Sequence, residues 1–164
     1  FLDPVKNKGF RVTDVSDDEL ESIANIRLLL EPPTMGAIAP GFDVGKEAEM
    51  RELADRIQRG AETNDLKLYL KCDVEFHARL TDMVGNPLLT DMVSDLRTRA
   101  RLGNLKKMAE SGRLATSAAE HYELLDALVA HDAELAEEIK IGRASCRERV
   151  WMSVVAVSLS KGRV

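Results

Sequence analysis

Apolar residues recur at spacings of three and four along most of the chain, which is the period of an amphipathic helix. Between Ser16 and Lys140 this pattern predicts six helices, which begin near residues 17, 44, 65, 86, 117 and 132. The connections between them are short and polar, as they are between antiparallel neighbours in a bundle. We therefore expect an all-α fold, an antiparallel bundle of about six helices.

Capping and helix-breaking residues mark the ends of these helices. Ser16–Glu19 is a capping box, and Asn86–Pro87 combines a favoured N-cap with proline in the first turn. Gly85 suits a left-handed C-cap, and Ser117–Glu120 is a second capping box that predicts the start of the fifth helix. Pro32–Pro33 is expected to kink or end the first helix.

The two ends of the chain differ from the bundle. Residues 4–13 alternate around Lys8–Gly9, which indicates the end of a β-hairpin. From Ile141 the helical period stops, and the last 24 residues hold the only Trp and five basic residues against one acidic. This stretch also resembles the translation of a sequencing adapter. We expect residues 141–164 to be a non-native tail and both ends of the chain to be cut.

Composition narrows the classes of protein that fit. The chain is 164 residues long, 45% hydrophobic and 31% charged, which is typical of a soluble globular domain. Only 4% is aromatic, which favours helices over strands. A net charge of −5 argues against a general nucleic-acid binder. No apolar run is long enough to span a membrane and no secretory signal is present, so we expect a cytoplasmic location.

Three polar residues interrupt the apolar faces of two predicted helices. Asp73 and His77 lie one turn apart on the face that carries Phe76, and His121 shares its face with Leu124. A carboxylate and imidazoles facing a core are costly unless they are paired. Asp73 and His77 could satisfy each other as a hydrogen-bonded pair. Together with His121 they could instead hold a divalent metal ion, because carboxylate and neutral imidazole ligate such ions jointly.

Other polar residues admit a simpler interpretation beside a functional one. Arg27 lies between apolar residues of the first helix; it could pair with Glu31, or it could hold the carboxylate of a bound effector. Cys72 is expected to be a small apolar filler of the core. His131, at a helix junction, is expected to be exposed to solvent.

Five motifs in order along the chain resemble one protein family. They are Gly9–Val12, Ile26–Pro32, Asp73–His77, Gly85–Leu89 and Glu120–Ala127. Over about residues 5–140 the chain resembles the FCD domain of the FadR-like branch of GntR-type bacterial transcription regulators. The resemblance implies a helical effector-binding and dimerisation domain over residues 15–140. Residues 1–14 would then be the remnant of a winged helix–turn–helix domain and its linker.

The resemblance also implies ligands for these residues. Many members of the family bind a divalent metal, often zinc, and the ligand positions carry over to Asp73, His77 and His121. A fourth ligand, a histidine, would fall at Arg143, where the sequence departs from the family pattern. The implied effector is a small carboxylate, for which Arg27 and Arg97 are candidate contacts.

The implied partners are operator DNA and a second copy of the chain. DNA would be bound through the missing N-terminal domain, with Lys6, Lys8 and Arg11 as remnants of its wing. We expect a homodimer that has no membrane partner and is not an enzyme.

Two other functions remain as alternatives. A metal-dependent hydrolase could use the same Asp/His/His set to activate water, but the nearest candidate base, Glu75, should point away from that face. A dimerisation bundle without any ligand would follow if the three polar residues lay too far apart to share one ion.

Overall fold

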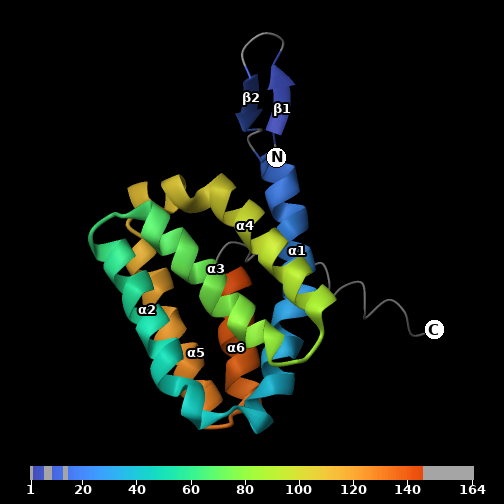
Figure 1. The fold of residues 1–164 in the computed structure, drawn as a ribbon, viewed down its shortest axis with the longest axis vertical. Coiled ribbons are helices and arrows are strands. Elements are labelled where there is room, and N and C mark those ends of the chain that lie inside the picture. The colour runs from blue at the N-terminus through green and yellow to red at the C-terminus, as the bar shows by residue number, and fades with distance from the viewer. Residues whose placement is uncertain (1, 6–8, 13–14, 146–164) are drawn as a thin grey trace, which may run out of the picture.

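The computed structural model describes residues 2–5, 9–12 and 15–145. Six α-helices account for most of these residues, which confirms the all-α bundle expected from the sequence (Figure 1). The α-helices are α1 (Asp17–Ile38), α2 (Glu47–Glu62), α3 (Leu66–Asp82), α4 (Pro87–Glu110), α5 (Leu114–Val129) and α6 (Ala133–Ser145). Two short 3-10 helices, η1 (Ala39–Gly41) and η2 (Val44–Lys46), join α1 to α2.

Two short strands precede the bundle. β1 (Leu2–Val5) and β2 (Gly9–Val12) pair antiparallel, with Leu2 opposite Val12 and Val5 opposite Gly9. The hairpin expected around Lys8–Gly9 is therefore present.

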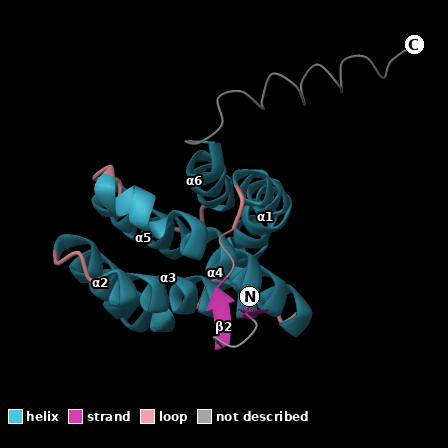
Figure 2. Ribbon diagram, turned by 90° about the horizontal axis from the view of Figure 1, so that it is seen from above, coloured by secondary structure: helices cyan, strands magenta, loops and turns pink. Residues whose placement is uncertain are grey.

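The helices form two layers. Viewed from above, α2, α3 and α4 lie in one row, and α5, α6 and α1 lie in the other (Figure 2). Contacts between α2 and α5 and between α1 and α4 close the two sides of the sandwich. Polar side chains on the inner faces of the middle helices, α3 and α6, therefore face the opposite layer instead of water.

The caps expected at two helix starts are confirmed. The Ser16 side chain accepts a hydrogen bond from the Glu19 amide at 3.2 Å, and the Asn86 side chain accepts one from the Leu89 amide at 3.2 Å. Gly85 has a φ of +76°, in the left-handed region that a side chain would disfavour. These signals act within one turn, so distant residues do not override them.

The proline pair does not end the first helix. α1 continues through Pro32 and Pro33 to Ile38. The two prolines lack the amides that would bond to the carbonyls of Leu28 and Leu29, which costs helix stability. Leu29 is 76% exposed, so water can reach its carbonyl, while Pro32 and Met35 are buried. Burial of these side chains keeps the segment helical.

The fifth helix begins one turn before the predicted capping box. α5 starts at Leu114, and its N-cap residue, Arg113, makes no side-chain capping bond. Leu114 is buried, which extends the helix toward the core. The Ser117 hydroxyl accepts a hydrogen bond from the Tyr69 hydroxyl at 3.0 Å and so serves a tertiary contact.

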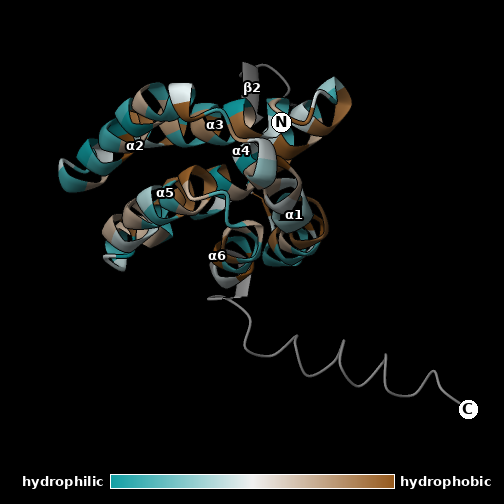
Figure 3. Cartoon of the chain, turned by 90° about the horizontal axis from the view of Figure 1, so that it is seen from below, coloured by the Kyte–Doolittle hydropathy of each residue, from teal (hydrophilic) through white to brown (hydrophobic). Residues whose placement is uncertain are grey.

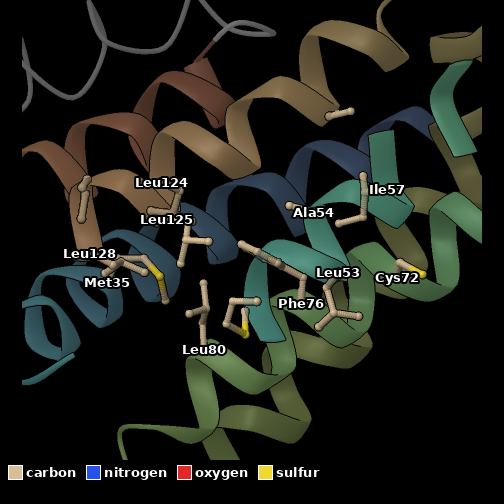
Figure 4. Packing of buried hydrophobic residues seen from close by; sticks show 14 of the residues in the cluster. Met35, Leu53, Ala54, Ile57, Cys72, Phe76, Leu80, Leu124, Leu125 and Leu128 are labelled. Carbon is tan, nitrogen blue, oxygen red and sulfur yellow. The ribbon is translucent and has the colours of Figure 1, made fainter. Parts of the chain in front are cut away.

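The main core lies between the two layers. Figure 4 shows Phe76 and Leu80 of α3 facing Leu124 and Leu128 of α5. Cys72 is fully buried in the same cluster, as expected of an apolar filler. The polar residues of the candidate site come from the same helices as this core.

The last helix extends beyond the expected start of the tail. α6 runs past Ile141 to Ser145, whereas Trp151 and the rest of the expected tail lie outside the described residues. Within the described part of the chain, none of the helices combines the length and the apolar character needed to cross a membrane.

Candidate metal centre and anion cavity

α3 and α5 bring the three polar residues of the apolar faces together. Asp73 and His77 on α3 and His121 on α5 are all buried. Each offers a ligand atom, and these atoms lie within 4.8 Å of one another. The three residues are therefore close enough to share one ion, whereas a bundle without a ligand was expected to hold them too far apart.

The orientation of His121 is set by the backbone. Its Nδ1 lies 3.1 Å from the Ala118 carbonyl oxygen, to which it can only donate. In a neutral ring this leaves Nε2 as an acceptor, and Nε2 lies 3.3 Å from Asp73 Oδ1. Two acceptors at this separation repel each other unless a proton or a metal ion lies between them. A backbone carbonyl bonded to the far ring nitrogen is also the usual support of a metal-bound histidine.

The donor set fits a divalent metal such as zinc. Bonds of about 2.0–2.2 Å at tetrahedral angles place neighbouring ligand atoms about 3.3–3.6 Å apart. The 3.3 Å between Asp73 Oδ1 and His121 Nε2 matches this spacing, and a ring nitrogen of His77 lies within 4.8 Å of the ligand atoms of the other two residues. Zinc at this position would neutralise the carboxylate and offer open positions to a ligand.

Two arginines of α4 also contact Asp73. Arg101 Nη2 donates to Oδ1 at 2.7 Å, and Arg97 Nη2 donates to Oδ2 at 3.1 Å. Burial alone would raise the pKa of Asp73, but the two guanidiniums hold it well below its usual range. Asp73 is therefore a carboxylate and never a neutral acid near neutral pH. Arg101 was not among the residues predicted from sequence, although it lies one turn after Arg97 on the same helix face.

Glu31 of α1 is a second buried carboxylate surrounded by cations. It accepts from Arg27 Nε at 2.5 Å, from Arg97 Nη1 at 2.7 Å and from Lys140 Nζ at 2.7 Å. Burial would raise the pKa of Glu31, and the three cations together lower it well below its ordinary value. Arg97 thus joins Glu31 to Asp73, and the two carboxylates form one network.

α6 contributes Lys140 to the centre. Its ammonium lies 3.0 Å from His77 Nδ1, so it donates to a neutral ring. Burial, followed by the charges of Arg97 and Lys140, lowers the pKa of His77 well below its usual value. A metal ion at Nδ1 would have to replace this ammonium. Sequence reasoning expected α6 to act through position 143, whose side chain lies outside the described residues.

A cavity of about 200 Å³ adjoins the centre. Its wall is formed by α1, α4, α5 and Lys140 of α6. In the described part of the chain its charged residues are five cations and two acids: Arg27, Arg97, Arg101, Arg113, Lys140, Glu31 and Glu120. Arg97 is 1% exposed, and among the described residues its Nε has no hydrogen-bond partner. Such a wall suits an anion.

The remaining candidates are placed as follows. Arg27 pairs with Glu31, which is the simpler of its two interpretations. It also lines the cavity, where an effector carboxylate would have to bind. Arg97, which the resemblance implied as an effector contact, is fully buried in the network. His131 is exposed, as expected.

The candidate DNA contacts cannot be placed. Lys6 and Lys8 lie outside the described residues, and Arg11 is described only as part of the β2 backbone. The candidate base Glu75 forms an ion pair with Arg79 at 2.5 Å.

Comparisons with known proteins agree with this architecture. The FCD domain model matches residues 22–140, and no curated protein matches the chain. Among solved structures, E. coli McbR/YncC has a TM-score of 0.75 at 21% identity, over 93% of this chain and 77% of that one. A GntR-type protein from Rhodococcus sp. RHA1 has a TM-score of 0.71 at 20% identity, over 90% and 70%. Streptococcus agalactiae GntR has a TM-score of 0.66 at 21% identity, over 90% and 74%.

At these identities the solved structures show a shared fold, while the domain match covers most of the chain and shows the family. FCD domains are parts of GntR-type transcription regulators, which are not enzymes, so the hydrolase alternative is excluded. The resemblance inferred from the sequence is confirmed: the chain belongs to the FCD domain family.

Proposed function

We propose that this chain is the ligand-sensing and dimerisation domain of a bacterial DNA-binding transcription regulator. In this proposal Asp73, His77 and His121 hold a divalent metal ion, zinc, and a small organic acid binds in the adjoining cavity. Operator DNA is bound by a separate N-terminal domain, of which residues 1–14 are the remnant.

The observation that carries the proposal is that the cavity and the candidate metal centre share residues. Arg97 and Arg101 contact Asp73 and also line the cavity, as do Arg27 and Lys140 around Glu31. An acid bound there would compete with Glu31 and Asp73 for the same cations. Its binding would rearrange contacts between α1, α4 and α6 and so favour one arrangement of the helices.

α1 provides a route from the cavity to the DNA-binding domain. Its middle lines the cavity through Ala24, Arg27 and Glu31, and its first residue follows directly on the segment after β2. A shift of α1 on ligand binding would therefore change the position of whatever precedes it. This is the coupling that a ligand-responsive regulator requires.

The metal site is tested by calorimetric titration of zinc into the chain and into two variants. His77→Ala should weaken zinc binding by at least tenfold, because it removes one of three ligands. The matched control is His131→Ala, which removes an exposed imidazole away from the centre and should leave the affinity unchanged. Equal affinity in wild type and His77→Ala would rule out the site.

A further inference from the structure

The cavity has two ends that carry positive charge. At one end Arg27, Arg97 and Lys140 surround Glu31. At the other end lies Arg113, whose backbone amide donates a hydrogen bond to the Met108 carbonyl. Met108 is the last residue of α4 that lines the cavity. Residues 97 to 108 of α4 run between the two ends, and a helix of this length rises roughly 16 Å. The cavity is therefore elongated along α4.

The two ends differ in how their cations are paired. At the first end the cations have acidic partners in Glu31 and Asp73. Arg113, in contrast, forms no ion pair with an acid among the described residues, and its Nε bonds only to the Ser111 hydroxyl at 3.0 Å. Arg113 is also the N-cap residue of α5 and makes no side-chain cap. The first turn of α5 lines the cavity through Thr116 and Ser117, so the positive end of that helix dipole lies at this end of the cavity.

The charges of the wall do not cancel. Among the described residues, with Asp73 included, the cavity and its immediate partners carry five cations and three acids, a formal excess of two positive charges. A divalent ion at the adjoining centre would raise this excess to four. A dianion compensates more of the excess than a monoanion does, with or without the metal ion, so the wall favours a dianion.

Apolar side chains make up much of the wall between the ends. Leu20, Ala24 and Ala100 line it there, beside the polar Arg101 and Asn104 of α4. This surface suits methylene groups and offers few partners to a heavily hydroxylated chain.

We propose that the effector is an α,ω-dicarboxylate, with one carboxylate at the Arg97 end and the second held by Arg113. The inference rests on the proposed function and extends it from a small organic acid to a linear dianion. Arg113 is then the residue that determines specificity for the second charge. It is exposed, and its side chain bonds to Ser111 and not to a candidate metal ligand, so its replacement should not disturb the centre.

The test compares dicarboxylates with monocarboxylates of equal chain length. Calorimetry on the zinc-loaded chain would pair glutarate with pentanoate, adipate with hexanoate and pimelate with heptanoate. In the best-fitting pair the diacid should bind at least tenfold more tightly. Arg113→Gln should weaken the diacid by about tenfold, the usual effect of losing one charge-assisted contact, and leave the monoacid unchanged. Lys106→Gln, which removes an exposed charge of α4 outside the cavity, is the matched control and should change neither.

The possible outcomes separate this inference from the proposed function. If each monoacid binds as tightly as its diacid, or if Arg113→Gln weakens both equally or neither, the dianion inference is overturned while carboxylate sensing stands. If no acid of either series binds the wild-type chain, both proposals fail for organic acids, and the zinc titration then decides the metal site alone.

Discussion

Glu31 and Asp73 are buried carboxylates, and removal from water makes each of them costly on its own. The cost is offset because Arg97 contacts both, while Arg101 completes the shell of Asp73 and Lys140 that of Glu31. Removing one member of such a network leaves an uncompensated charge in the interior, which is far more costly than losing a surface ion pair. The network therefore stabilises the packing of α1, α3, α4 and α6 while its charges are intact.

Acid should destabilise the metal-free chain in two stages. The folded pKa of His77 lies well below 6.5, so below about pH 6.5 the unfolded chain binds a proton that the folded chain does not. Stability then falls with pH by up to about 1.4 kcal/mol per unit for this group. Glu31 and Asp73 also have lowered folded pKa values. Their stabilisation is complete above about pH 4 and is lost as pH falls below it. Urea unfolding at successive pH values, with a chelator present, measures both stages.

Variants assign the first stage to its residue. His77→Gln should reduce the slope between about pH 6.5 and 4, because the amide does not titrate. His131→Gln is the control, since this exposed histidine lies outside the buried network and contacts the Ala39 carbonyl oxygen through Nδ1 at 2.9 Å. A slope that is unchanged in His77→Gln would contradict the assignment.

How far the sequence predicts single residues depends on what periodicity can detect. Asp73, His77 and His121 could be found because each interrupts an apolar face. Lys140 and Arg101 could not be found in this way, since the charged end of a long basic side chain usually reaches solvent whichever helix face it lies on. Their role depends on Glu31 and Asp73 of other helices, and no local pattern records that contact.

At the scale of helices, the sequence predicted the features that depend on neighbouring residues and missed those that depend on packing against other helices. The Ser16 and Asn86 caps were predicted because a cap and its amide lie within three residues. Pro32–Pro33 was expected to kink or end α1, which instead continues to Ile38, and Ser117 was wrongly expected to begin α5. In both cases burial against another helix outweighed the local preference.

The packing of α2 on α3 depends on Gly60. A Cβ at this position would lie 2.8 Å from the Tyr69 amide nitrogen and 3.0 Å from its Cα, and backbone cannot move aside cheaply. Gly60→Ala should therefore destabilise the chain by about 1–3 kcal/mol, although alanine is the better helix former by about 1 kcal/mol. Gly142→Ala, where nothing lies within 4 Å in α6, is the control and should be neutral or slightly stabilising. A Gly60→Ala variant as stable as wild type in urea would show that the helices can separate at this point.

For the whole molecule, the two-layer arrangement leaves apolar side chains on the outer faces of α1 and α4. Ile26 and Leu29 on α1 are 42% and 76% exposed, and Leu88 and Met92 on α4 are 69% and 45% exposed. α1 and α4 pack against each other, and Figure 3 shows apolar stretches on α1. Apolar groups gathered on adjacent helices are typical of an interface between subunits.

We predict that this surface, Ile26, Leu29, Leu88 and Met92, joins two copies of the chain. In a two-fold dimer each substitution acts twice, so Leu29→Glu removes two buried leucines and costs at least about 4 kcal/mol. This is roughly a thousandfold in the dissociation constant. Light scattering after size exclusion should give the mass of two chains for wild type and of one chain for Leu29→Glu. Leu135→Glu, on the 43% exposed Leu135 of α6, should stay dimeric. A wild-type chain that is monomeric at high concentration, or a dimer that only Leu135→Glu dissociates, would exclude the α1–α4 surface as the interface.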